Sequence, residues 1–187
     1  MKLVFIQCGK TGVGKTTAEL KMKEEYGVEP VEVYTTRDRR LDDPDHYHCV
    51  SKGKFNQLLM DKKFTYSFEV ANGTYYGFIL PDKKYSVISF LSEKDVKGFR
   101  DSLPANVFSS SYELIADYNQ EEAIEGRGTP VTDLDDRNSK SCSCPVKVHR
   151  DGVLLYVRDI ISKFAVMTNT TNPHGVNKYV ENNIRSK

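Results

Sequence analysis

The segment Gly9 to Thr16 constrains this chain more than any other, because its residues GKTGVGKT fit the pattern G-x-x-x-x-G-K-[ST]. This pattern forms a phosphate-binding loop, or P-loop, when it joins a buried strand to a helix. Residues 2–8 before it are an apolar run rich in β-branched and aromatic side chains, which favours a buried parallel strand. Residues 16–26 after it carry apolar side chains four positions apart and precede Gly27, which indicates an amphipathic helix with a glycine cap. The context therefore favours a polyphosphate site over an ordinary glycine-rich turn.

The chemistry of such a loop comes from its glycines, its lysine and its hydroxyl group. Glycines let backbone N–H groups turn toward a polyphosphate, and the helix N-terminus adds partial positive charge. We expect Lys15 to reach the β- and γ-phosphates of ATP, and the Thr16 hydroxyl to be a ligand of Mg²⁺. The expected ATP-binding residues of this segment are Gly9, Lys10, Thr11, Gly12, Val13, Gly14, Lys15, Thr16 and Thr17.

The composition and net charge limit which partners we expect the chain to bind. With 187 residues, 39% of them hydrophobic, we expect one globular unit with room for inserted lobes. The net charge of +1 gives no overall field that attracts nucleic acid or membranes, so phosphate affinity must come from local arginines and lysines. No apolar run reaches transmembrane length, and the first expected strand leaves no room for a signal peptide. We therefore expect a cytoplasmic protein without membrane or nucleic-acid partners.

Predicted strands and helices alternate, which favours an α/β fold with a parallel sheet flanked by helices. The expected strands span residues 29–36, 46–50, 85–91, 105–110 and 164–169, and the expected helices span residues 52–63, 93–102, 112–125, 151–163 and 173–184. Residues 64–70 and 75–80 alternate strongly around a turn, which predicts a β-hairpin with one exposed face. We expect this hairpin in a small mixed lobe rather than in the central sheet.

Three arginines, Arg37, Arg39 and Arg40, follow the second expected strand. Charged loops of this kind are commonly just solvated. The sharper alternative is a phosphate clamp, because arginine presents a rigid fork of donors to phosphate oxygens.

Later segments of the chain resemble the guanylate kinase family of nucleoside monophosphate kinases, and the likeness covers most of the length. The P-loop is common to many families, so the distinguishing motifs come after it. TTRDRR at 35–40 is similar to the family's T-T-R-x-x-R, DHYHCVS at 45–51 to its D-Y-x-F-V-S, and GTYYG at 73–77 to its G-N-Y-Y-G. EGRGT at 125–129, with Arg137 after it, looks like the lid segment, and Asn169, ending the last expected strand, resembles the asparagine beside the donor adenine.

The resemblance implies a P-loop NTPase core at about residues 1–31, 79–124 and 138–187. It also implies an inserted lobe at about 32–78 that binds the acceptor monophosphate, and a lid at about 125–137 that closes over ATP. The implied acceptor-phosphate residues are Arg37, Arg40, Tyr47 and Tyr76, and the implied catalytic residues are Lys15, Arg37, Arg127 and Arg137. Positive charge would offset the repulsion between the two phosphates. No side-chain base is required, because the acceptor oxygen is already ionised at neutral pH.

Positions that read guanine in the family hold other residues here: Val33, Tyr66, Phe78 and Ser89. Leu91 stands at the second aspartate of the family's D-x-D, and Glu69 lies three residues beyond the family's hairpin glutamate. A site that loses its polar readers loses discrimination for the base that they bind. The resemblance thus implies a kinase that uses ATP and Mg²⁺ to phosphorylate a (deoxy)nucleoside monophosphate whose base is not guanine.

Three other functions remain open, of which the weakest is a P-loop kinase that acts on another phosphorylated or hydroxylated acceptor. A different alignment of the hairpin, with Glu69 as the guanine reader, would make the chain an ordinary guanylate kinase for GMP or dGMP. The family also contains scaffold domains that bind protein partners without catalysis; the intact P-loop opposes this alternative, and the missing D-x-D favours it. We expect a monomer or a homodimer.

Overall fold

The apolar run near the start of the chain forms the central strand of a parallel sheet. The computed structural model describes residues 1–41, 43–70, 73–115 and 144–169. The sheet has five strands in the order β2-β7-β1-β8-β9, and all four pairings are parallel. The strands are β1 (Lys2–Cys8), β2 (Glu29–Pro30), β7 (Tyr85–Phe90), β8 (Val107–Ile115) and β9 (Lys147–His149). The predicted parallel α/β core is therefore confirmed.

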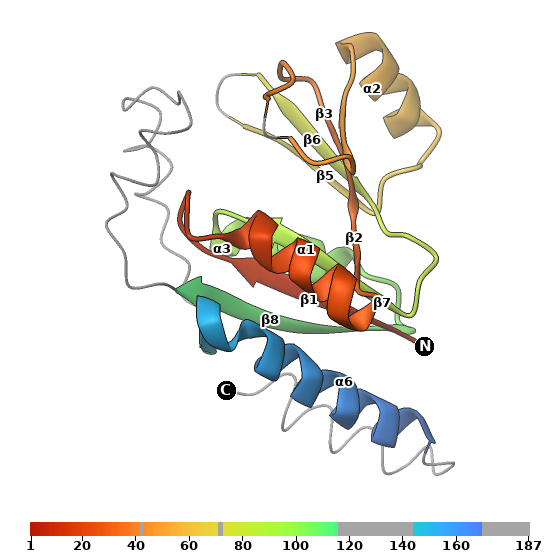
Figure 1. Ribbon diagram of the computed structural model, residues 1–187. Helices are drawn as coiled ribbons and strands as arrows, with labels where there is room; N and C mark the ends of the chain where they lie inside the picture. The colour runs from red at the N-terminus through yellow and green to blue at the C-terminus, as the bar shows by residue number, and fades with distance from the viewer. Residues whose placement is uncertain (42, 71–72, 116–143, 170–187) are drawn as a thin grey trace.

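Helices cover both faces of this sheet, because successive side chains of β1 point to opposite sides. Leu3 and Phe5 pack in one apolar cluster with residues of α1 (Lys15–Tyr26) and α6 (Val153–Asn169). Ile6 packs in a second cluster, with residues of α3 (Glu93–Ser102). Figure 1 shows α1 and α6 on one side of the sheet and α3 behind it. No helix that the structure describes combines the length and the hydrophobicity needed to span a lipid bilayer.

A second, mixed sheet begins where the predicted strand 29–36 divides in two. The chain changes sheets at Val31, whose N–H still donates to the Val87 carbonyl oxygen of β7 at 2.8 Å. The prediction of a single strand at 29–36 is therefore wrong. β2 pairs with β7, whereas β3 pairs with β4 and β6. The second sheet has the order β4-β3-β6-β5 and consists of β3 (Glu32–Thr35), β4 (Tyr47–Cys49), β5 (Tyr66–Glu69) and β6 (Tyr75–Ile79). The predicted hairpin is confirmed as β5 and β6, which pair antiparallel in this mixed sheet.

The two faces of the second sheet have different neighbours. On the inner face Phe78 contacts the rings of Phe90 and Phe99, which belong to β7 and α3. The outer face is covered by α2 (Lys52–Met60), whose Phe55 ring lies 5.6 Å from the ring of Tyr75. In Figure 1 this sheet lies above the parallel sheet, with α2 on its far side. The inner face therefore shares an apolar cluster with the parallel sheet.

The predicted helix 112–125 is wrong in its first turn, because residues 112–115 form the end of β8. Alternate residues of this strand are buried, with Tyr112 and Leu114 at 0% and 1% exposure. Pairing with β1 and packing in the sheet override the helical tendency of this stretch. The remainder of that predicted helix, the predicted lid 125–137 and the predicted helix 173–184 lie outside the described residues.

The predicted strand 164–169 is wrong as well, because these residues end α6, which runs unbroken from residue 153. Buried Val157, Ile160, Phe164 and Met167 recur three and four positions apart, which is the period of a helix. Asn169 therefore ends a helix rather than a strand, and its place beside adenine stays a prediction.

Candidate functional site

The P-loop joins β1 to α1 and has the backbone geometry that its glycines permit. Gly12 and Gly14 have φ angles of 84° and 98°, in the left-handed region. A Cβ atom on Gly9 would lie 2.8 Å from a carbonyl oxygen of β8, so only glycine fits there. The Lys15 Nζ donates to the carbonyl oxygens of Gly9 (2.7 Å) and Lys10 (2.8 Å). The ammonium group thus lies against the loop, where a bound polyphosphate would compete with these carbonyls for it.

The first turn of α1 presents backbone donors and hydroxyl groups. The helix begins after Gly14, and no side chain caps it. Thr16 and Thr17 are exposed, whereas the Val13 side chain is buried in the core and can offer only its backbone to a ligand. The combination of uncapped N–H groups, a lysine and exposed hydroxyls suits a polyphosphate.

A chain of polar side chains lies beneath the P-loop, at the carboxyl ends of β1, β7 and β8. Gln7 Nε2 is within hydrogen-bond distance of the Lys15 carbonyl oxygen (3.0 Å), Glu19 Oε1 (3.2 Å) and Ser89 Oγ (2.7 Å). Ser89 donates to Glu19 Oε1, and the Tyr112 hydroxyl donates to Gln7 Oε1 at 3.2 Å. This polar chain ties the backbone of the P-loop to two neighbouring strands.

Glu19 is the acidic member of the polar chain, and it is only 4% exposed. Burial raises the pKa of its carboxyl group, although hydrogen bonds from Ser89 and Gln7 act in the opposite direction. Glu19 Oε2 lies 3.6 Å from Nε2 of His46, which precedes β4. Burial lowers the pKa of His46. The contact joins α1 to the second sheet.

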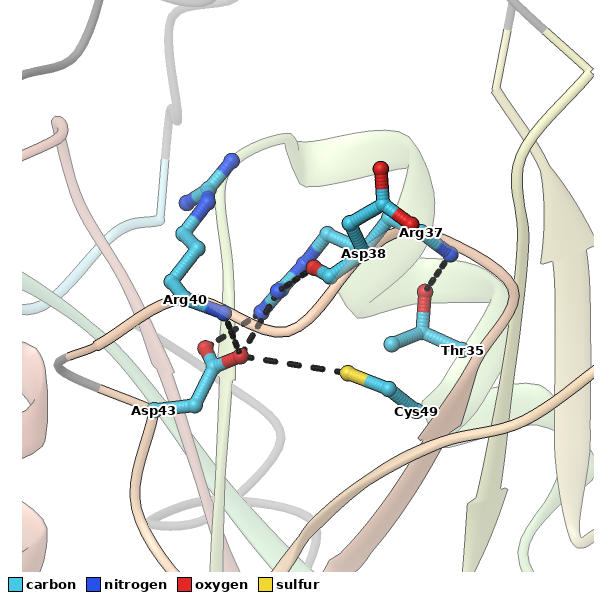
Figure 2. A network of polar contacts seen from close by, with 6 residues as sticks. All are labelled: Thr35, Arg37, Asp38, Arg40, Asp43 and Cys49. Carbon is cyan, nitrogen blue, oxygen red and sulfur yellow. Dashed lines mark hydrogen bonds and ion pairs between the residues drawn. The ribbon is translucent and has the colours of Figure 1, made fainter.

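Arg37 and Asp43 form an ion pair in the loop after β3. Figure 2 shows the two side chains facing each other, with Nη1 2.7 Å from Oδ2 and Nη2 2.5 Å from Oδ1. The Arg40 N–H donates to the same carboxylate at 2.8 Å, and the Cys49 thiol lies 3.9 Å from it. Burial raises the pKa of Asp43, but the hydrogen bonds from Arg37 and from the Arg40 N–H outweigh it, so the pKa lies below its ordinary value of 3.8. The exposed Arg40 guanidinium points away from this carboxylate (Figure 2).

Two tyrosines lie beside Arg37. The Arg37 Cζ is 5.6 Å from the centre of the Tyr47 ring. Burial acts to lower the pKa of Arg37, whereas Asp43 and Tyr76 act to raise it, so Tyr76 lies near this guanidinium. Burial and the negative charge of Glu19 raise the pKa of Tyr47, so its hydroxyl stays protonated and can donate. The structure therefore brings Arg37, Tyr47 and Tyr76 together, with Arg40 in the same loop.

The residues at the family's guanine-reading positions divide into two places. Val33, Phe78 and Tyr66 occupy adjacent positions across β3, β6 and β5. Val33 and Phe78 are only 4% and 3% exposed, and the half-buried Tyr66 ring stacks on Phe78 at a centroid distance of 6.2 Å. Ser89 belongs instead to the polar chain beneath the P-loop. Val33 and Phe78 are thus buried among other side chains of the protein and expose little surface to a ligand.

Glu69 lies on the other face of the second sheet. It pairs with Tyr75, whereas Tyr66, three residues before it, pairs with Phe78 on the inner face. Neighbouring residues of a strand alternate between faces, and the Tyr75 ring contacts α2. Glu69 therefore shares the face that α2 covers.

Arg127 and Arg137, the predicted lid arginines, lie outside the described residues. Sequence analysis missed a different arginine, Arg150, in the short turn η1 (Arg150–Gly152). A Cβ atom placed on Gly14 would lie 3.0 Å from the Arg150 Cδ, so this side chain lies against the P-loop. Residues 139–150 show no clear periodicity, and nothing local in the sequence indicates this contact.

Sequence analysis also missed Gln7 and Glu19, although the sequence carries a signal for both. Gln7 interrupts the apolar run 2–8, and Glu19 lies between Ala18 and Met22 on the buried side of α1. Polar residues at core positions commonly mark functional sites.

The first turn of α1 offers an oxygen donor suited to a hard cation. In the described part of the chain, no three His, Cys, Asp or Glu side chains are grouped to hold a metal ion. Mg²⁺ does not need such a group, because phosphate oxygens and water commonly complete its shell. The exposed Thr16 hydroxyl fits this kind of site.

Two kinds of comparison find similar proteins, whereas no family model matches the chain. The guanylate kinases of Neisseria meningitidis serogroup A (serotype 4A) and serogroup B are each 30% identical to it over 139 residues. The matches cover 67% of this chain and 65% of each relative, so the chain spans slightly less than two thirds of the length of these curated relatives. The crystal structure of guanylate kinase from Anaplasma phagocytophilum has a similar fold, with a TM-score of 0.57, 16% identity, and coverage of 100% of this chain and 97% of that one.

Proposed function

The chain belongs to the guanylate kinase family, and from this premise we propose that it transfers the γ-phosphate of ATP to a nucleoside or deoxynucleoside monophosphate. The observation that carries the proposal is the presence of two anion-binding groups: the P-loop on the parallel sheet, and Arg37, Tyr47 and Tyr76 on the second sheet. Residues 32–78 would form the acceptor lobe, residues 125–137 the lid, and the rest the core.

The acceptor phosphate would bind beside Arg37. Asp43 holds this guanidinium in place, and Tyr47 offers a protonated hydroxyl as a donor. Arg40 is exposed and lies in the same loop as Arg37, so its guanidinium can turn toward a bound phosphate. The acceptor oxygen needs no base, since it is already ionised at neutral pH. The protein's part is to hold and orient it.

The donor phosphates would bind at the P-loop. Lys15 would exchange its bonds with the loop carbonyls for bonds with phosphate oxygens, and Arg150 lies close enough to Gly14 to line the donor site. The Thr16 hydroxyl would hold Mg²⁺, which supplies positive charge to the donor phosphates when bound. These charges would stabilise the transferring group more than they stabilise the reactants.

The acceptor base, we propose further, is not guanine. Guanine presents a carbonyl oxygen, an N1 donor and an exocyclic amine, and unpaired burial costs about 1–3 kcal/mol for each such group. Val33 and Phe78 offer no polar partner, and a single Tyr66 hydroxyl cannot replace the two acceptor oxygens of a carboxylate. Glu69 is exposed on the face of the second sheet opposite to Tyr66 and Phe78, which argues against its use as a guanine reader together with them.

Steady-state ADP release with GMP, dGMP, dTMP, dUMP and dCMP at matched concentrations tests both proposals. We expect turnover with at least one acceptor that lacks guanine and little or none with GMP. A clear preference for GMP would return the protein to ordinary guanylate kinase activity. Binding of ATP without turnover of any acceptor would favour a binding module instead.

Replacement of Arg37 tests the acceptor-phosphate site. Arg37→Ala should raise the acceptor KM or lower kcat by about 1.5–3 kcal/mol, or about 10- to 150-fold, because a charge-assisted contact is lost. Arg39→Ala is the matched control, since Arg39 is an exposed arginine of the same loop. Equal losses in the two variants would mean that the general charge of the loop matters rather than the position of Arg37.

A further inference from the structure

The carboxyl end of β7 lies beside the P-loop but carries no acidic side chain. P-loop proteins that bind nucleoside triphosphates commonly hold Mg²⁺ with the hydroxyl of the loop and an aspartate from a neighbouring strand. β7 pairs in parallel with β1, and Phe90 at its end is opposite Cys8, the residue before the loop. The residues at this end are Ser89, Phe90 and Leu91. The strand therefore lacks the usual carboxylate.

A carboxylate nevertheless reaches the end of β7 from α1. Ser89 Oγ donates to Glu19 Oε1, and Gln7 Nε2 lies 3.2 Å from the same oxygen. Glu19 follows Thr16 by three residues in α1, so the two side chains leave the same side of the helix. A hydroxyl and a carboxylate thus lie one turn apart on the helix, and the carboxylate contacts the end of β7.

The Glu19 carboxylate is held as the ligands of metal ions usually are. Gln7 links it to the Lys15 carbonyl oxygen and to Tyr112, which ties its position to the P-loop and to β8. Hydrogen bonds of this kind orient metal-binding carboxylates in proteins. They engage Oε1, whereas Oε2 faces His46 Nε2 at 3.6 Å, beyond hydrogen-bond distance.

The surroundings of Glu19 favour a cation. Glu19 is 4% exposed, and its carboxylate contacts Gln7 and Ser89 as well as His46, which precedes β4. A buried negative charge at the meeting place of two phosphates would oppose binding of both unless a positive charge accompanied it. The basic groups that face Glu19 are Lys15 of the P-loop and His46.

We propose that Glu19 is a metal-positioning residue, which supplies from α1 the carboxylate that β7 lacks and orients Mg²⁺ with its nucleotide at the P-loop. The proposal rests on the proposed binding of ATP, and it is independent of which acceptor is used.

Isothermal titration of ADP and of ATP, each with Mg²⁺ and with EDTA, tests this proposal without any transfer reaction. For the parent protein we expect tighter binding with Mg²⁺ than without it. Glu19→Gln should reduce this gain by about 10- to 100-fold, as is typical when a group that orients a metal is lost, while binding without the metal stays the same. Glu24→Gln is the matched control, because Glu24 is an exposed glutamate of the same helix. Electron paramagnetic resonance of Mn²⁺ with ADP gives a second measurement.

A variant that carries a carboxylate on β7 instead of α1 distinguishes a metal-positioning role of Glu19 from a merely structural one. Ser89→Asp in the Glu19→Gln background should restore most of the metal-dependent gain. If Glu19→Gln does not fold, Glu19→Met supplies an apolar replacement of similar volume, and Ser89→Asp is combined with it. The proposal is overturned if Mg²⁺ increases the nucleotide affinity of the folded Glu19 variants as much as that of the parent protein. It is also overturned if Mg²⁺ does not increase the affinity of the parent protein. Absence of nucleotide binding in the parent protein would instead overturn the proposed function and this inference with it.

Discussion

At the scale of single residues, Lys15 is the side chain on which ATP use should depend most. Its ammonium group is already held at the P-loop by two carbonyl oxygens, so nucleotide binding requires only an exchange of partners. Lys15→Ala should abolish measurable ADP release and leave the melting temperature nearly unchanged, because Lys15 belongs to neither buried apolar cluster. Lys21→Ala, an exposed lysine of the same helix, is the control. Equal turnover in Lys15→Ala and the parent protein would contradict the role assigned to the loop.

The ion pair of Arg37 and Asp43 predicts a pH dependence of stability. The pKa of Asp43 is lowered in the folded state, so the carboxylate stabilises the fold above its ordinary pKa of 3.8, and this contribution is lost as the pH falls through the lower folded value. Asp43→Asn should therefore cost stability at pH 7, by about 1.5–3 kcal/mol for hydrogen bonds to a charged group. The difference from the parent protein should shrink as the pH falls below 3.8. Urea unfolding at pH 7, 5 and 3 measures it; a constant difference would exclude this linkage.

At the scale of elements, the hairpin of β5 and β6 is fixed against the residues before it by a close contact at Gly77. A Cβ atom on Gly77 would lie 2.6 Å from the ring of Phe64, which packs on the outer face of the second sheet. Gly77→Ala should destabilise the protein by about 1–3 kcal/mol, the usual cost of overpacking. Gly53→Ala in α2 is the contrasting variant, because its nearest atom is 4.0 Å away and alanine favours a helix. Chemical denaturation distinguishes the two; a neutral Gly77→Ala would mean that the ring moves aside.

Elements with local signals were predictable, and elements defined by distant contacts were not. Helices α2 and α3 begin where sequence analysis placed them, because Ser51 and Ser92 accept hydrogen bonds from backbone N–H groups three residues on. The far end of β8 has no such marker and is set by pairing with β1. The same division holds in the candidate site. The P-loop and the motif around Arg37 are contiguous patterns, whereas the contact of Glu19 with Ser89 spans 70 positions and exists only after folding.

At the scale of the whole molecule, one apolar cluster joins the two sheets, and Phe99 of α3 is at its centre. Phe99 is fully buried, and its ring contacts Phe90 of the parallel sheet as well as Tyr66 and Phe78 of the second sheet. The same cluster packs the inner face of the second sheet, which carries Tyr47 and Tyr76, against α3 and the parallel sheet. The position of the P-loop relative to the group around Arg37 therefore depends on this cluster.

The shared cluster predicts that both sheets unfold in one cooperative transition. Phe99→Ala should destabilise the protein by about 3–5 kcal/mol, as for other buried aromatic residues, and hydrogen exchange should then quicken together in β1 and in β6. Met60→Ala is the control, since Met60 ends α2 and is 82% exposed. Faster exchange in β6 with unchanged protection in β1 would contradict this prediction, because it would mean that the second sheet opens by itself. Joint loss of protection would mean instead that α3 couples the second sheet to the parallel sheet, so that substitutions distant from the P-loop and from Arg37 alter how these two groups face each other.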